Sequence, residues 1–311
     1  MRLISVTVGP LAAPDDDAVS LSQVPSGAGA IVIDGTYAAD YSATRIAASQ
    51  AVGSATDLTL TTAATNLGGR SVVIVCAGNS GVNFTVKGTD INGAYLSETL
   101  TGANTSRVAT RGLFMTVTAI SSSGAATGNV SAGVNGLLAT MDTPRRLLLT
   151  TSADDTGDTF TITGTDWNDR PVTETLTGVN NSTAYTVRDY KTITSIWTSG
   201  ASSGTVKFGT NGIASSRPIS LDRFALAPTL LQVTVSGTVN FTVQQSLQDP
   251  NAVGYASVNW VNHPDSGVAA ATATAQANYA YIPTVTRITL NSQTNPGYVI
   301  YNVLQASGTP V

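Results

Sequence analysis

The chain has 311 residues, of which 11% are charged, with a net charge of −4 at pH 7, one cysteine and one histidine. These values exclude the basic stripe of a nucleic-acid-binding protein, a disulfide within the chain and a zinc site of the usual ligand types. No run approaches the roughly 20 apolar residues of a membrane-spanning helix, so we expect no membrane partner.

The first 61 residues predict an extended N-terminal arm with short strands. A strand-like piece covers residues 2–8, and an Ala/Gly/Ser-rich passage with the apolar run 30–33 follows it. The start lacks the basic and apolar regions of a secretory leader, so we expect none. Chain ends this rich in small residues are usually disordered unless something binds them. We therefore expect an arm, and a C-terminal tail, that dock on other subunits.

Residues 78–136 reappear as residues 154–212 at a constant offset of 76, without a gap, and about 26 of the 59 paired positions are identical. An ungapped internal repeat of this length indicates a duplicated module. We assign residues 62–137 to the first copy and residues 138–213 to the second.

Each copy contains short β-rich runs separated by Gly, Asn and Asp clusters, and no stretch keeps a helical period. This spacing predicts an all-β fold of tandem small β-sandwich or Ig-like modules. Phe84 and Phe160 alternate with polar neighbours and should point into the core. The expected strands are residues 70–75, 83–87, 95–101, 116–121 and 129–132, and in the second copy 146–151, 159–163, 172–177, 192–197 and 205–208.

Residues 214–311 predict a C-terminal β domain. The run Val239-Asn-Phe-Thr-Val243 repeats the run Val82-Asn-Phe-Thr-Val86, so the domain is either unrelated or a diverged third copy. Its expected strands are residues 230–236, 239–247, 257–261, 284–290 and 298–304.

The acidic residues kept in both copies could be read as calcium loops or as paired catalytic carboxylates. Asp90, Asn92 and Glu98 recur as Asp166, Asn168 and Glu174. Calcium takes about six to eight oxygen ligands, and glycoside hydrolysis needs two carboxyls across a cleft. A hairpin turn in which Asp and Asn bond their own backbone explains the pattern better. We expect no catalytic, metal or cofactor-binding residue.

Four aromatic side chains are candidates for an interface. Trp167 lies in a turn of the second copy, and Trp260, Tyr279 and Tyr281 lie in the C-terminal region. Exposed rings anchor protein interfaces, and they can also stack on sugars. The lone thiol of Cys76 lies in an apolar run and should be buried and inert. His263 offers little support for a Ser/His/Asp arrangement.

The repeated signature resembles a module of tailed-bacteriophage virion proteins. Its elements are the segments 84–92, 98–102 and 116–120, and again 160–168, 174–178 and 192–196. The opening MRLISVTVGPL and residues 239–249 are also similar to phage structural proteins. The first copy departs from the signature at residues 93–95, which affects only the tip of a turn.

The resemblance implies a non-enzymatic virion subunit that assembles in the host cytoplasm. Its expected place is the tail or the head-to-tail region, as a collar or fibre-attachment protein. A capsid decoration protein is the alternative within that class, and a glycan-binding adhesin is the alternative of another class. The implied partners are tail, portal-vertex or capsid subunits and further copies of the chain, with a host glycan as the less favoured partner.

Overall fold

The computed structural model describes residues 2–12, 14–38, 40–62, 64–78, 81–102, 106–136, 138–222, 229–254 and 258–305. In these residues the regular secondary structure is almost wholly antiparallel strand, which confirms the all-β prediction. The helices are one turn of α-helix, α1 (Pro250–Val253), and a short 3₁₀ segment, η2 (Ser266–Val268). No helix of the described chain has the length and apolar character needed to span a membrane.

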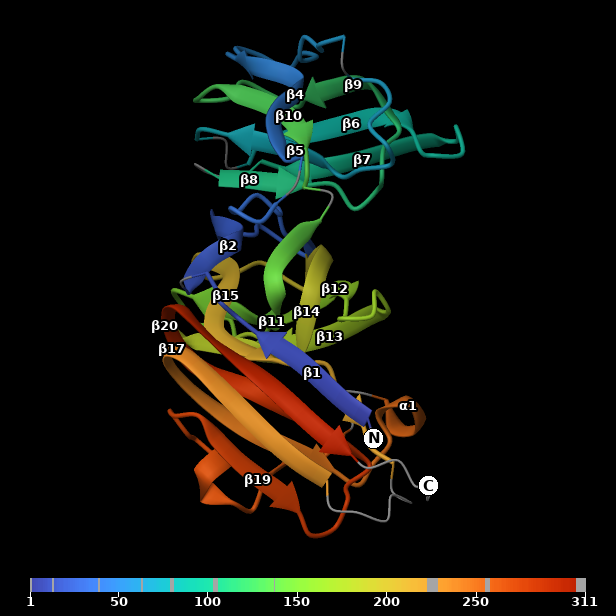
Figure 1. The fold of residues 1–311 in the computed structure, drawn as a ribbon. Helices are drawn as coiled ribbons and strands as arrows, with labels where there is room; N and C mark the ends of the chain where they lie inside the picture. Colours follow the sequence, from blue (N-terminus) through green and yellow to red (C-terminus); the bar gives the residue numbers. More distant parts are fainter. Residues whose placement is uncertain are drawn as a thin grey trace.

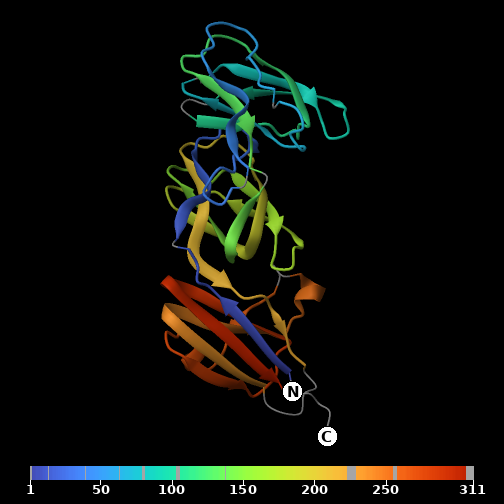
Figure 2. The ribbon, with the colours of Figure 1, turned by 45° about the horizontal axis from the view of Figure 1, so that its top comes forward.

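Three units stacked in a column make up the molecule (Figures 1 and 2), and each has its own hydrophobic core. The first unit contains β4 (Ser42–Gln50), β5 (Val72–Cys76), β6 (Asn83–Thr89), β7 (Tyr95–Thr101), β8 (Ser106–Ala109), β9 (Thr116–Ser122) and β10 (Val130–Val134). The second contains β2 (Asp15–Gln23), β3 (Gly29–Ala30), β11 (Ala139–Thr151), β12 (Thr159–Thr165), β13 (Pro171–Thr177), β14 (Thr183–Thr198) and β15 (Val206–Ser215). The third contains β1 (Arg2–Val8), β16 (Ile219–Ser220), β17 (Thr229–Ser246), β18 (Val261–Asn262), β19 (Ala275–Tyr279) and β20 (Val285–Gln305).

One order of strand pairing recurs in all three units. In the first unit β4–β10–β5–β8 faces β7–β6–β9. In the second, β2–β15–β11–β14 faces β13–β12–β14, because β14 is long enough to serve both layers. In the third, β1–β20–β17–β19 faces β18–β17–β20, and both long strands pass through the two layers. This is the pairing that a diverged third copy would have.

The internal repeat is reproduced strand by strand. The bounds of β6 and β12 differ by 76 residues, as do those of β7 and β13. Phe84 and Phe160 are fully buried, as their alternation with polar neighbours predicts. Of the expected C-terminal strands, the one at residues 257–261 is reduced to β18, and its residue 257 lies outside the described residues.

The N-terminal segment (residues 2–61) differs from the expected arm. Its strands pair within the same chain: β1 with β20, β2 with β15 and β4 with β10. In Figure 1 the blue segment starts in the third unit, passes through the second and ends in the first. The segment therefore supplies one edge strand to each unit, in the reverse of their order along the chain. Each unit therefore contains a strand that lies outside its own continuous stretch of sequence.

The segment enters the first two units in the same register. Val130 of β10 lies opposite Gln50, and the equivalent Val206 of β15 lies opposite Gln23. Each later pairing of β4 with β10 also recurs between β2 and β15, with offsets of 76 residues in the repeat and 27 in the segment. Strands β2 and β4 are therefore equivalent parts of the two copies, separated from them in sequence.

Polar side chains of the second and third units bond the N-terminal segment in the stretches that connect its strands. The amide of Gln293 in β20 both accepts a hydrogen bond from the Leu11 N–H and donates one to the Leu11 carbonyl. The fully buried guanidinium of Arg145 in β11 donates to the Ala12 carbonyl at 3.4 Å and to the Tyr37 hydroxyl at 2.7 Å. The bonds to Leu11 and Ala12 satisfy backbone groups that lie between β1 and β2, outside any strand pairing.

Two glycines permit the close crossing of the N-terminal segment. A Cβ at Gly133 of β10 would overlap the carbonyl of Ser42, and one at the equivalent Gly209 of β15 would overlap the carbonyl of Asp15. Both neighbours are backbone atoms, which cannot rotate away as a side chain can. Glycine is therefore required where β4 and β2 pass.

We expect Gly133→Ala and Gly209→Ala each to lower the free energy of unfolding by about 1–3 kcal/mol, because the added methyl group displaces an edge strand. Gly53→Ala is the matched control, since its Cβ would meet nothing within 4 Å. Urea denaturation of the three variants measures the effect. Equal stability of all three would show that the crossing is not tight.

Candidate functional site

The four predicted interface aromatics differ widely in their exposure to solvent. Tyr281 is 91% exposed, Trp260 lies half-buried under the guanidinium of Arg287, and Trp167 lies half-buried in the β12–β13 turn. Tyr279 is only 4% exposed, and its hydroxyl is 2.7 Å from the Thr286 hydroxyl. Burial raises the pKa of Tyr279 to about 12. Its assignment as a surface anchor is therefore corrected, because it belongs to the core of the third unit.

The repeated acidic residues serve the turns in both copies. Asp166 Oδ1 accepts hydrogen bonds from the backbone N–H groups of Asn168 and Arg170, at 2.8 and 3.1 Å. Glu174 accepts from the backbone N–H groups of Val187 and Arg188. The first copy makes the same contacts at positions 76 residues earlier. These contacts match the hairpin-turn interpretation and commit the carboxylates to backbone donors.

The two single residues of reactive type are buried. The thiol of Cys76 lies in the core of the first unit, where an inert thiol was expected. His263 packs its ring 4.8 Å from that of Tyr279, and its Nδ1 accepts the Asp265 N–H at 3.1 Å. Burial lowers the pKa of His263, which favours the neutral imidazole.

One acidic cluster also forms in the described chain. The carboxylates of Asp15, Asp16 and Asp17 lie within 4.8 Å of one another at the start of β2, and Lys207 forms an ion pair with Asp16. The hydrogen bond to Asp15, and then burial, raises the pKa of Asp17. Oxygen ligands of this kind suit hard cations, but the lysine already supplies a positive charge there.

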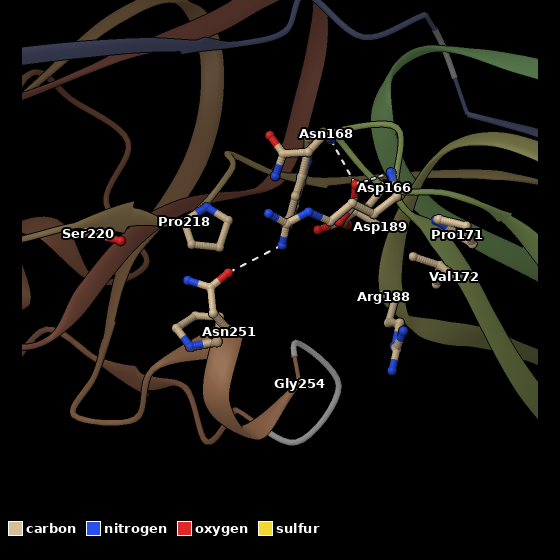
Figure 3. Close-up of a pocket in the computed structure, with 13 residues that line it drawn as sticks. Asp166, Asn168, Pro171, Val172, Arg188, Asp189, Pro218, Ser220, Asn251 and Gly254 are labelled. Atoms are coloured by element: carbon tan, nitrogen blue, oxygen red, sulfur yellow. Dashed lines mark hydrogen bonds between the residues drawn. The ribbon is translucent and has the colours of Figure 1, made fainter.

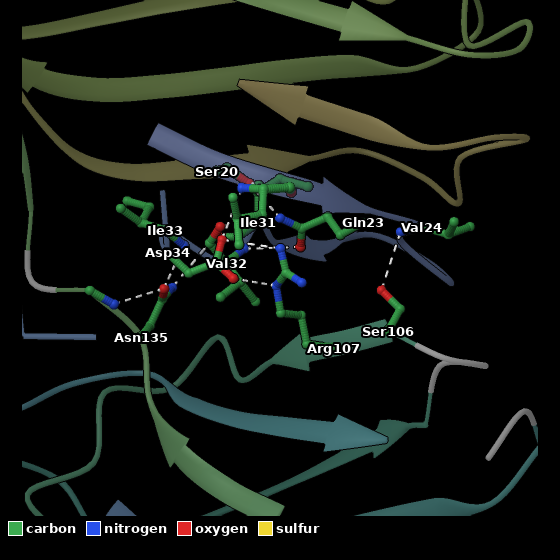
Figure 4. A network of polar contacts seen from close by, with 12 residues as sticks. Ser20, Gln23, Val24, Ile31, Val32, Ile33, Asp34, Ser106, Arg107 and Asn135 are labelled. Atoms are coloured by element: carbon green, nitrogen blue, oxygen red, sulfur yellow. Dashed lines mark hydrogen bonds and ion pairs between the residues drawn. The ribbon is translucent and has the colours of Figure 1, made fainter. Parts of the chain in front are cut away.

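The junction of the first and second units is held by buried polar contacts (Figure 4). Arg107 of β8 forms an ion pair with Asp34 of the N-terminal segment, and Asp34 also accepts the Leu21 N–H at 3.0 Å. Burial raises the pKa of Asp34, against the opposing effect of Arg107. The side chain of Gln23 bonds both the N–H and the carbonyl of Val32. The N-terminal segment therefore stabilises the junction between the first and second units and also contributes strands to their sheets.

The junction of the second and third units encloses a cavity of about 510 Å³ (Figure 3). The β12–β13 turn and the middle of β14 line one side, and residues around β16 and α1 line the other. Arg170 crosses it, since its guanidinium donates to the Asn251 side chain at 3.3 Å. The lining residues are Asp166, Trp167, Asn168, Arg170, Pro171, Val172, Arg188, Asp189, Pro218, Ser220, Pro250, Asn251 and Gly254.

Asp189 is the unusual residue of this cavity. Its side chain is 1% exposed, and among the described residues neither carboxylate oxygen has a hydrogen-bond partner of acceptable geometry. Burial raises its pKa to about 6, although the guanidinium groups of Arg287 and Arg146 and the hydroxyl of Ser215 favour the charged form. A buried, charged carboxylate without hydrogen-bond partners lowers the free energy of unfolding at neutral pH.

The equivalent positions of the first copy differ in chemistry. Trp167 and Asp189 correspond to Ile91 and Leu113, which are exposed apolar side chains. Sequence reasoning identified Trp167 but missed Asp189. The replacement of an apolar residue by an acid, inside an otherwise retained repeat, was the signal that could have found it.

No protein-family model matches the chain, and no curated protein matches it either. Among solved structures, a chain from the atomic structure of Sulfolobus Turreted Icosahedral Virus aligns with 95% of this chain and 97% of its own length. The two are 9% identical, and the TM-score is 0.17. A likeness of that size carries no argument about fold or function.

We expect Asp189→Asn to stabilise the protein at neutral pH. The folded-state pKa of about 6 lies above the ordinary value of 3.8 for an aspartate, so the stability that the carboxyl contributes is fully present below about pH 4 and is lost as the pH rises through 6. The variant should gain up to about 3 kcal/mol at pH 7.5, and the gain should vanish near pH 4.

Thermal and urea unfolding of wild type and variant at pH 4, 6 and 7.5 measure this gain. Asp169→Asn is the control, because its exposed ion pair with Lys191 should contribute less than about 1 kcal/mol. A pH-independent difference between wild type and Asp189→Asn would contradict the assignment.

Proposed function

We propose that the chain is a non-enzymatic structural subunit of a virion of the tailed-phage type, placed in the tail or head-to-tail region. The residues kept in both copies support this role. Asp166 and Glu174 bond turn amides, and Thr165 and Thr192 bond each other across β12 and β14 at 2.7 Å. What the duplication preserved is therefore the geometry of strands and turns, which is the requirement on a mechanical part.

The observation that carries the proposal is the path of the N-terminal segment. Pulling one unit away from its neighbour would require a strand to leave a sheet, since β1, β2 and β4 belong to three units and one continuous segment. Extraction of a strand breaks many hydrogen bonds together, whereas an ordinary linker between domains resists separation hardly at all. Three units that each contain a strand of one continuous segment suit a subunit that bears mechanical load.

Apolar side chains on the outer face of the third unit support assembly with other subunits. Leu3, Leu304 and Leu230 lie directly opposite one another on β1, β20 and β17. Leu3 and Leu230 are 65% and 48% exposed. With only 11% charged residues in the chain, such a face favours burial against a further copy or another virion protein. A specific interface removes roughly 1,200–2,000 Å² from water.

The copy number per virion tests the proposal. We expect quantitative mass spectrometry of purified particles to give a fixed number, about six to eighteen copies, as the symmetry of a tail or portal vertex implies. Hundreds of copies would favour the capsid decoration alternative. Absence from the particle would contradict both and leave the glycan-binding adhesin as the remaining candidate.

A further inference from the structure

We propose that the cavity between the second and third units is a binding site for a neutral saccharide unit. The inference goes beyond the structural role proposed above and does not depend on it. It rests on the cavity's size, on polar atoms buried in its wall without partners, on the balance of its charges and on its aromatic lining.

The size of the cavity is that of a small-molecule site. Its volume of about 510 Å³ falls within the range of roughly 300–1,000 Å³ that ligand pockets occupy. Residues of two separate units form its walls, and such junctions are frequent places for ligand sites.

Buried polar atoms in the wall call for a partner that both donates and accepts. Both oxygens of Asp189 and the Nε of Arg188 are buried without a hydrogen-bond partner in the described part of the chain. A buried polar group lowers the stability of the protein while it is unpaired. A sugar hydroxyl group can donate to a carboxylate or accept from a guanidinium, so separate hydroxyl groups of one sugar suit the two residues.

The charges of the lining favour a neutral ligand over an ion. Asp166 and Asp189 are balanced by Arg170 and Arg188. The Asp166 Oδ1 atom already accepts two backbone N–H groups, and Arg170 bonds Asn251. The lining residues themselves therefore carry no net charge, which suits a polyol, since its hydroxyl groups can bond groups of both signs.

The apolar part of the wall matches the C–H faces of a sugar ring. Trp167 lines the cavity together with Pro218 and Pro250. A large aromatic surface beside a few oriented polar groups is the usual composition of such a site. The first copy, with Ile91 and Leu113 at the equivalent positions, has neither the indole nor the carboxylate. The site is therefore specific to the second copy.

Ligand-detected NMR on the full chain tests the inference, with the methyl glycosides of glucose, galactose, mannose and N-acetylglucosamine as probes. We expect saturation transfer to at least one of them. The indole N–H resonance of Trp167 should shift on its addition, while those of Trp197 and Trp260 stay in place. The variant Trp167→Phe assigns the resonance by removing it, so this readout does not depend on how a more disruptive variant folds.

Variants then test the residues. Trp167→Ala and Asp189→Asn should each weaken the apparent affinity at least tenfold, and the matched control Ile91→Ala should leave it unchanged. Transfer to none of the four glycosides, or a shift that spares the Trp167 indole, would overturn the proposal. Either result would leave the virion role unaffected, because that role is judged by copy number alone.

Discussion

The structure depends on one constraint: every unit needs an edge strand that the N-terminal segment supplies. Ile46 and Ala47 of β4 enter the core of the first unit, Val19 of β2 enters that of the second, and Val8 of β1 enters that of the third. The segment is synthesised first, yet its partners β10, β15 and β20 come at the end of each unit. Such long-range pairing is slow to form, because loop closure must precede the contacts that reward it.

The sequence was sufficient for the duplicated part of the fold. Short β-rich runs between turn dipeptides located most strands of both copies, and the constant offset made each copy a check on the other. It was insufficient for β2 and β4, where Asp15–Gln23 begins with three aspartates and Ser42–Gln50 is rich in Ala and Ser. Strands of this composition resemble a linker in the sequence. Their hydrogen-bond partners are distant along the chain, so no local pattern reveals them. Gly133 and Gly209, which are equivalent in the two copies, are the residues of the repeat that reflect the close passage of the N-terminal segment.

The candidate site likewise contains some residues that the sequence identifies and others that it does not. Trp167 could be identified from sequence because an aromatic residue in a polar turn is unusual. The change from Leu113 to Asp189 marks that position of the repeat, but it does not show that the carboxyl is buried. Tyr279 and Tyr281 looked alike at a spacing of two residues, but β19 ends at Tyr279, so only that ring continues the inward face of the strand. Burial depends on where a strand ends, and a local pattern places that end only within a few residues.

Hydrogen–deuterium exchange of the full chain and of a chain lacking residues 1–50 measures whether the N-terminal segment stabilises all three units. The deletion removes β1, β2, β3 and β4 together. Without β1, β2 and β4, the strands β20, β15 and β10 each lack one pairing partner. We therefore predict that amides of β10, β15 and β20 lose protection in all three units. Protection in these strands equal to that of the full chain would contradict the account, since it would mean that the units fold as independent modules with a dispensable arm.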